Sequence, residues 1–261
     1  MTSDYAFRHA LPEDLPEIRD LLELNEMPSE GLEKVLTHCL VAEHAGRIVG
    51  AIGLEPKGRN GLVRSLVVAG DHQGQRLGTA LNARMINAAR LLGIDRLYLL
   101  TTSAEAFFAP SGYKVIEHSR IPAAIRETDE FRKMSPHAST CMLRDIRNVP
   151  IHATRELLHM QPAVPGARRW AVGLNNTMLT YLEVEPNSRF ETHSHESEQI
   201  TMVLSGLLFF QIGQTIHRVV SGEVMAIPAN VPHSVWTETE AAKVVDAWSP
   251  VIEEYSTRIQ G

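Results

Sequence analysis

Cysteine, long apolar runs and clusters of basic residues are all scarce in this chain. Its 261 residues include only two cysteines, Cys39 and Cys141, which are too few for a disulfide framework and are typical of a reducing compartment. The first residues lack the basic start and apolar run of a signal peptide, and no stretch approaches the roughly 18 apolar residues of a membrane helix. With a net charge of −6 and no block of Lys and Arg, the chain is not expected to bind nucleic acid or an anionic membrane. A cytoplasmic protein with a small-molecule partner is therefore expected.

The pattern of the sequence changes near residue 146. Before it, helical and strand-like patterns alternate, whereas later the chain consists of short apolar runs separated by Pro, Gly and Asn. Several prolines lie between the two parts and suit a connector that holds one short helix. We therefore expect an α+β domain over residues 1–146, a linker over 147–163 and an all-β domain over 164–261.

The first part carries clear signals for helices and strands. An amphipathic helix is predicted for "PEDLPEIRDLLEL", where apolar residues recur at 15, 18, 21 and 22. Two strands are predicted in "LVAEHAGRIVGAIGLE", around a turn centred on Ala45 and Gly46. A strand, a polar turn and a second helix follow in "GLVRSLVVAGDHQGQRLGTALNARMINAARLLG", and the helix should end at Gly93.

The turn between that strand and helix reads "HQGQRLGTA", from residue 72 to residue 80. Consecutive backbone N–H groups at a helix N-terminus form an anion pocket, and glycines let a pyrophosphate approach closely. A tight connection without a ligand would also explain glycines here, so the turn alone leaves both readings open.

The residues around this turn resemble the acetyl-CoA-binding motif of the GNAT N-acetyltransferases. That motif is Arg or Gln, two residues, Gly, one residue, then Gly or Ala, and Gln73, Arg76 and Gly78 stand at its three positions. The later segment "AEAFFAPSGY" is similar to the family's next helix and strand entry. More narrowly, "LVRSLVV" and "AAIRETDEF" resemble the arsenic-resistance branch of the family. The resemblance covers nearly all of residues 3–146.

This resemblance implies a cofactor site and a reaction. The strand ending at Val68 would offer its backbone to the pantetheine arm of acetyl-CoA, and the following turn would hold the pyrophosphate. The implied acetyl-CoA site comprises Leu66, Val67, Val68, Gln73, Gly74, Gln75, Arg76, Leu77, Gly78 and Thr79.

Acetyl transfer needs a base that deprotonates the amine and a route for the thiolate to leave. Glu55, at the end of a strand, is the first candidate for the base, and His72 and Tyr113 are weaker ones. Phe108 stands where many relatives carry a tyrosine that protonates the thiolate. Arg64 would pair either with a substrate carboxylate or with Glu55.

A second set of candidate residues lies in "THSHESEQITMVLSG". His193 and His195 are two residues apart, so in an extended chain their side chains point to the same face. If the strand continues, Gln199 shares that face and Glu198 does not. His233, in "GEVMAIPANVPHSVW", is a plausible fourth ligand. Surface histidines are the alternative, but three imidazoles and an amide are typical of a transition-metal site.

These segments resemble the two motifs of the cupins, which are double-stranded β-helix (jelly-roll) barrels. The first motif is matched by His193, His195, Gln199 in place of a glutamate, and Gly206; the second is matched by Gly222, Pro228, Asn230 in place of a glycine, and His233. The implied metal is divalent Zn, Fe, Ni, Mn or Cu. The segment "VVDAWSPVIEEY" is similar to cupins that open unsaturated uronate rings, in which an Asp and a following Arg act on the sugar. Asp246 matches the first as a candidate catalytic residue, whereas Ile252 replaces the second.

Three functional readings follow. The leading one is an acetyl-CoA-dependent N-acetyltransferase that acts on a small amine, fused to a metal-binding cupin that acts on or senses a related molecule. In the second, the cupin is the enzyme, as an isomerase, lyase or oxygenase, and the first domain is a weak catalyst. In the third, the cupin is a sensor or a dimerisation module. The cupin resemblance also implies a homodimer.

Overall fold

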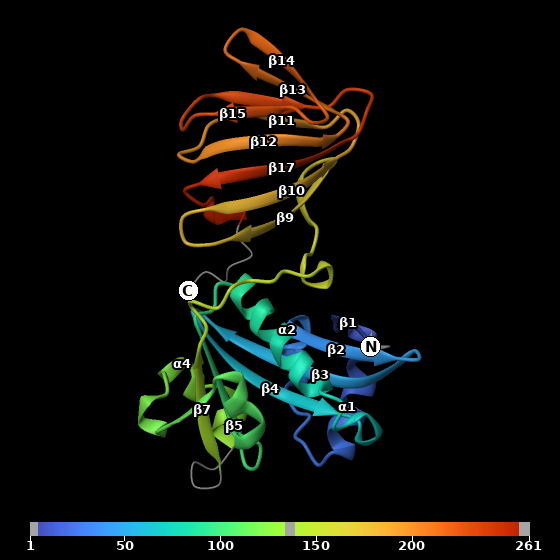
Figure 1. The fold of residues 1–261 in the computed structure, drawn as a ribbon, viewed down its shortest axis with the longest axis vertical. Coiled ribbons are helices and arrows are strands. Elements are labelled where there is room, and N and C mark those ends of the chain that lie inside the picture. Colours follow the sequence, from blue (N-terminus) through green and yellow to red (C-terminus); the bar gives the residue numbers. More distant parts are fainter. Residues whose placement is uncertain (1–4, 134–138, 256–261) are drawn as a thin grey trace. The chain divides into compact units, whose positions relative to one another are not determined.

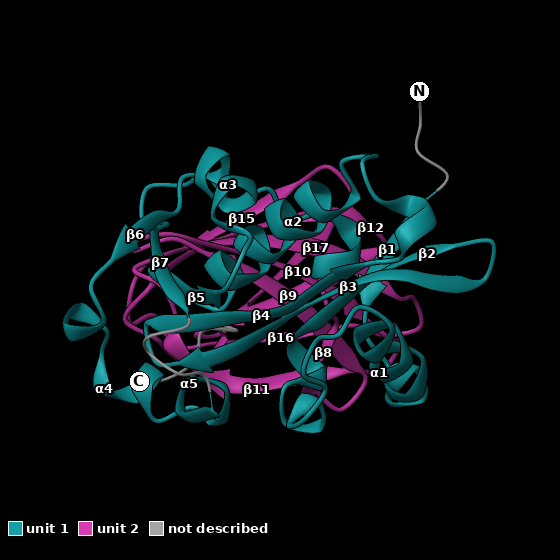
Figure 2. Cartoon of the chain, turned by 90° about the horizontal axis from the view of Figure 1, so that it is seen from below, with its two compact units in different colours: residues 1–157, 258–261 teal, residues 158–257 magenta. Residues whose placement is uncertain are grey.

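The computed structural model describes residues 5–133 and 139–255 and divides the chain into two compact units (Figure 2). Among these residues the first unit ends at Leu157 and the second begins at Leu158. The division falls inside the segment expected to be a linker, which contains a 3₁₀ turn at Arg155–Leu157 and the first residues of a strand at Gln161–Val164. No helix in the described ranges is both long and apolar enough to cross a bilayer.

The first unit is a seven-stranded sheet with helices, in the order β1-β2-β3-β4-β5-β7-β6 (Figure 1). All its strand pairs are antiparallel except β4 with β5, which is parallel. The strands are β1 (Ala6–His9), β2 (Cys39–His44), β3 (Arg47–Lys57), β4 (Asn60–Val68), β5 (Arg96–Thr101), β6 (Lys114–Ile116) and β7 (Thr140–Asp145). The helices are α1 (Leu15–Leu24), α2 (Leu77–Leu91), α3 (Glu105–Phe108), α4 (Ala123–Arg126) and α5 (Asp129–Lys133).

Strand alternation builds a core on each face of this sheet. Along β2, Leu40 and Ala42 pack in the cluster that contains α2, whereas Cys39 and Val41 pack in the cluster that contains α1. Both helices bury the apolar face predicted from the sequence, and neither contains a proline beyond its first turn. The N-terminus of α2 is therefore held against the sheet by packing along the rest of the helix.

Strands β4 and β5 separate partway along their length. Their ladder runs from Asn60 with Arg96 to Leu62 with Tyr98, while β4 continues to Val68. The separation coincides with a register shift against β3 and with Ser65 in the left-handed region at φ 54°, as expected of a β-bulge that bends its strand. The last part of β4 therefore has one edge that β5 does not cover.

The second unit consists of two sheets that face each other. One has the strand order β15-β12-β17-β10-β9-β8 and the other β11-β16-β13-β14. The strands are β8 (Gln161–Val164), β9 (Ala167–Gly173), β10 (Met178–Val184), β11 (Arg189–His193), β12 (Glu198–Ser205), β13 (Leu207–Ile212), β14 (Thr215–Val220), β15 (Val224–Ile227), β16 (His233–Trp236) and β17 (Ala242–Ser249). This is the all-β jelly roll that the sequence predicts.

Strand β12 shows how the sequence sorts inside from outside. Gln199, Thr201 and Val203 are buried, whereas the residues between them are exposed, as an alternating strand with one buried face requires. Ile200 and Met202 thus lie on the outer face of the six-stranded sheet, 52% and 44% exposed. The homodimer expected from the cupin resemblance stays a prediction.

Gly206 is expected to contribute strongly to the stability of the second unit. It has φ +77°, and a Cβ added there would lie 2.0 Å from the backbone oxygen of Ala241. Gly206→Ala should therefore lower the free energy of unfolding by at least about 3 kcal/mol, because the backbone clash adds to left-handed strain. Gly213→Ala is the matched control, since its φ is +59° but no atom lies within 4 Å, and should cost only about 1 kcal/mol.

Urea unfolding followed by tryptophan fluorescence measures this effect in the right unit. All three tryptophans, Trp170, Trp236 and Trp248, belong to the second unit. Equal losses in the two variants would show that the close contact at Gly206 does not contribute to stability.

Candidate active site and metal centre

The N-terminus of α2 is preorganised to receive an anion. Arg76 precedes the helix with φ 63°, Gly74 has φ 75°, and no side chain caps the first turn. The free N–H groups of that turn, at Leu77, Gly78 and Thr79, carry the positive end of the helix dipole. They follow directly on the uncovered end of β4, so an anion site and an open strand edge adjoin.

Side chains hold the loop between β4 and α2 in place. Gln73 donates through Nε2 to the carbonyl oxygen of Val68 at 3.0 Å, and the Tyr5 hydroxyl donates to Oε1 of Gln75 at 2.8 Å. His72, a weaker candidate for the base, has its Nδ1 2.9 Å from the Tyr5 hydroxyl. We therefore assign His72 to the support of the loop.

The glycine at position 78 has a packing reason that the sequence did not reveal. A Cβ there would lie 3.2 Å from Cζ of Phe107, so the ring closes on the first turn of α2. Arg76, which replaces the family's first glycine, keeps the left-handed backbone that a glycine adopts without strain. The departure from the motif therefore changes a side chain and leaves the backbone path intact.

Glu55 belongs to a partly buried cluster of charges. Arg64, with a side chain only 4% exposed, has Nη1 3.9 Å from Oε2 of Glu55 and Nε 2.8 Å from Oε2 of Glu130. Lys57 lies 3.1 Å from the other oxygen of Glu55. Burial raises the pKa of Glu130, and the positive charge of Arg64 opposes that rise. Arg64 thus pairs with Glu55, one of its two predicted roles, and also with Glu130, which the sequence reasoning missed.

The segment after β5 contributes two aromatic residues to the core of the first unit. Phe108 is buried and its ring meets that of Tyr113 edge to face, with centroids 5.4 Å apart. The Tyr113 hydroxyl donates to Oδ1 of Asn82 at 3.3 Å, and burial raises the pKa of this tyrosine. Tyr113 is therefore a core residue, and Phe108 has no proton to give.

In the second unit, three histidines converge. The candidate ligand atoms of His193, His195 and His233 all lie within 4.8 Å of one another. His193 ends β11 and His233 begins β16, and the two residues are paired in register. His195 comes from the loop before β12 and rests edge-on against Trp248, with ring centroids 5.1 Å apart.

The same hydrogen bond orients each ring. Nδ1 of His193 lies 2.7 Å from the carbonyl oxygen of Glu191, that of His195 2.6 Å from Ser197, and that of His233 2.9 Å from Val231. A carbonyl can only accept, so each Nδ1 donates a proton and each Nε2 is the atom that faces the cluster. At His195 the Nε2 also lies 3.2 Å from the amide oxygen of Gln199.

The chemistry of this donor set fits a metal ion. Nε2 of His233 is buried without a hydrogen-bond partner, and burial lowers the pKa of that imidazole, which favours the neutral, ligating form. Gln199 places Oε1 3.2 Å from Nε2 of His195. Three imidazoles and an amide oxygen are suitable ligands for a divalent transition metal.

Asp246 lies beside this cluster, and both of its carboxylate oxygens accept hydrogen bonds. It is 4% exposed, and it accepts from Thr201 at 2.5 Å, Thr180 at 3.3 Å and Gln199 at 3.4 Å. Burial raises the pKa of Asp246 to about 6, and these three hydrogen bonds oppose the rise. A carboxyl group with such a pKa exchanges a proton readily near neutral pH.

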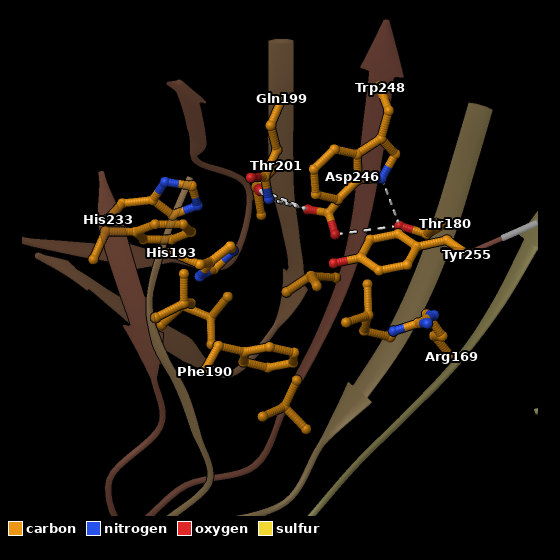
Figure 3. A pocket seen from close by; sticks show the side chains of 16 residues that line it. Arg169, Thr180, Phe190, His193, Gln199, Thr201, His233, Asp246, Trp248 and Tyr255 are labelled. Atoms are coloured by element: carbon orange, nitrogen blue, oxygen red, sulfur yellow. Dashed lines mark hydrogen bonds between the residues drawn. The ribbon is translucent and has the colours of Figure 1, made fainter. Parts of the chain in front are cut away.

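Figure 3 shows His193, His233 and Asp246 around one pocket. Its volume, with the open mouth included, is about 500 Å³. Arg169 from β9 and Tyr255 also line it, and neither was predicted from the sequence. The loop before β16 is tied to the first motif, because the Asn230 N–H donates to the His195 carbonyl at 2.8 Å. Asn230 replaces the family's glycine at φ 63°, a conformation that asparagine tolerates.

Comparison with known protein families gives one match in each of the two units. Residues 36–115 match the model of the acetyltransferase (GNAT) domain, and residues 180–248 match the model of the cupin domain. The first unit thus contains a GNAT-like α+β domain, and the second has the all-β architecture of a cupin domain. Both predicted resemblances are thereby confirmed, whereas the narrower likeness to the arsenic-resistance branch is not.

Amino-acid acetyltransferases are among the relatives of this chain, in agreement with the GNAT match in the first unit. An amino-acid acetyltransferase of Pseudomonas syringae pv. tomato is 29% identical over 49% of this chain and 32% of its own length. One from Neisseria meningitidis is 28% identical over 47% of this chain and 30% of its own length. The chain therefore spans about a third of the length of these relatives.

A solved structure shares the fold of the same half. It is the N-acetylglutamate synthase of Neisseria gonorrhoeae in complex with coenzyme A and N-acetyl-glutamate, at 25% identity and a TM-score of 0.50. The match covers 56% of this chain and 36% of that one.

Proposed function

We propose that the first unit transfers the acetyl group of acetyl-CoA to the amino group of an amino acid. The observation that carries this proposal is the uncapped N-terminus of α2 beside the uncovered end of β4. The first provides N–H groups for a pyrophosphate, and the second provides free backbone groups for the amides of a pantetheine arm. The residues assigned to the cofactor are Leu66, Val67, Val68 and the segment from Gln73 to Thr79.

The acceptor class is supported by the relatives and by charge. The curated relatives are amino-acid acetyltransferases, and the similar synthase was crystallised with an N-acetylated amino acid. In this chain, Arg64, Glu55 and Glu130 place both signs of charge in one partly buried cluster. A zwitterion, with its ammonium and carboxylate groups, is complementary to such a cluster.

Glu55 acts in this proposal as the general base. It accepts a proton from the ammonium group, which turns the nitrogen into a nucleophile. As the nitrogen–carbon bond forms, the carbon–sulfur bond breaks and the CoA thiolate leaves as the anion, because thiols of this kind have a pKa near 8.5 and Phe108 offers no proton. The second proton of the nitrogen, acidic once the bond has formed, passes to solvent.

Glu55→Gln tests this assignment. We expect kcat to fall by about 100-fold, as loss of a general base does, with little change in the KM for acetyl-CoA. The assay is acceptor-dependent release of CoA thiol by the full chain with a panel of amino acids. Glu43→Gln is the control, since Glu43 is instead paired with Arg8 at 3.2 Å. An unchanged kcat in Glu55→Gln would remove Glu55 from the mechanism.

We further propose that the second unit binds a divalent transition metal through His193, His195, Gln199 and His233. Four neutral ligands leave the ion its full charge, so it would act as a Lewis acid. Asp246, hydrogen-bonded to Gln199, is the acid–base group of the pocket. The buried carboxyl favours a catalytic cupin over a purely structural one.

A further inference from the structure

Arg169 lines the cupin pocket, and no salt bridge joins it to a carboxylate of the described residues; Glu254 is the acidic residue whose charge acts on it from farther away. It lines the pocket together with His193, His233 and Asp246, and Figure 3 shows its guanidinium on the side away from the two histidines. Its guanidinium carbon lies 3.8 Å from the centre of the Tyr255 ring, a cation–π contact. Burial lowers the pKa of Arg169, although its guanidinium stays charged at any physiological pH.

The strand register explains how this side chain enters the pocket. Asp246 is paired across the sheet with Thr180 and Thr201. Two residues along β17, Val244 is paired with Leu182, which in turn is paired with Arg169. All these side chains therefore share the inner face, and Arg169 lies one row from Asp246. The adjacent Arg168 is exposed and belongs to the outer face.

Desolvating a guanidinium in a pocket is costly unless an anion joins it there. Asp246 does not serve, because its oxygens accept hydrogen bonds from Thr201, Thr180 and Gln199. The planar fork of an arginine matches a carboxylate with two parallel hydrogen bonds. The aliphatic side chains and the ring of Phe190 that complete the lining suit a short carbon chain.

We infer that the cupin pocket binds a small organic acid, whose carboxylate pairs with Arg169 and whose far end reaches the His193, His195 and His233 cluster. Arg169 is the anchor that fixes the direction of the ligand along the pocket. This inference does not rest on acetyl transfer by the first unit, so either can fail alone.

Binding of dicarboxylates of graded length to the zinc-loaded full chain tests the inference. We expect one of succinate, glutarate or adipate to bind in calorimetric titration, and the mono-amide of the best one to bind more weakly. Arg169→Gln should weaken binding at least about tenfold, or about 1.4 kcal/mol. Arg168→Gln removes the same charge from the outer face and should stay within about twofold.

Three results would overturn the inference: no binding of any of the three acids, equal binding by wild type and Arg169→Gln, or an equal loss in Arg168→Gln. If Arg169→Gln fails to fold, Arg169→Lys takes its place, because it keeps the charge and the aliphatic stem. It should bind several-fold more weakly, since an ammonium cannot form the two parallel bonds. Unchanged binding in that variant would then contradict the assignment.

Discussion

His233→Ala is expected to reduce the bound divalent metal from about one ion per chain to less than about a tenth of that. His233 is the most buried of the three histidines, and its Nε2 has no hydrogen-bond partner among residues 5–133 and 139–255. Its loss removes a ligand whose direction is fixed by the hydrogen bond to Val231. The measurement is elemental analysis of the purified full chain after dialysis against buffer that contains a trace of the divalent metal.

The matched control is His217→Ala. His217 is an exposed histidine on β14, so its loss should leave the metal content unchanged. The cluster would not be a metal site if His233→Ala kept its metal, or if His217→Ala lost as much. Tryptophan fluorescence of each variant shows whether the second unit remains folded, because Trp248 packs against His195.

Thr79→Glu is expected to weaken acetyl-CoA binding at least about tenfold, because a carboxylate near the pyrophosphate repels it by about 1.4 kcal/mol or more. Thr79 is exposed in the first turn of α2. At that position an acidic side chain interacts favourably with the helix dipole and should slightly stabilise the unliganded protein. Binding and stability should therefore change in opposite directions.

Calorimetric titration of acetyl-CoA into the full chain measures the affinity, and thermal unfolding followed by circular dichroism measures the stability. Thr79→Gln introduces a side chain of the same size as glutamate but without its charge. It should bind acetyl-CoA within about threefold of wild type, as an uncharged surface change does. Equal affinity of wild type and Thr79→Glu would place the cofactor elsewhere.

Much of the fold could be predicted because its signals are local. The alternation along β12, the apolar face of α2 and the turn at Ala45 and Gly46 each involve residues close in sequence. The convergence of His193, His195 and Gln199 could be predicted for the same reason, since they are neighbours along the chain; their role as metal ligands stays a prediction. Only His233 needed a second motif, and its place at the start of β16 agrees with the Pro and Asn residues that precede it.

The residues that escaped prediction come from elements distant in sequence. Arg169 reaches the pocket from β9, and Glu130 reaches Arg64 from α5. Their roles depend on strand order and on the packing of a short helix, neither of which leaves a local pattern. Ile252, which follows β17, stands where the uronate-opening cupins carry an arginine. The pocket nevertheless contains an arginine, Arg169, which comes from β9.

The most direct test of the proposed reaction is release of CoA thiol from acetyl-CoA by the full chain with single amino acids, together with mass analysis of the acceptor. The account predicts that at least one amino acid accelerates thiol release and gains one acetyl group on its amine for each thiol released. Binding of acetyl-CoA without acetylation of any amino acid would contradict the account.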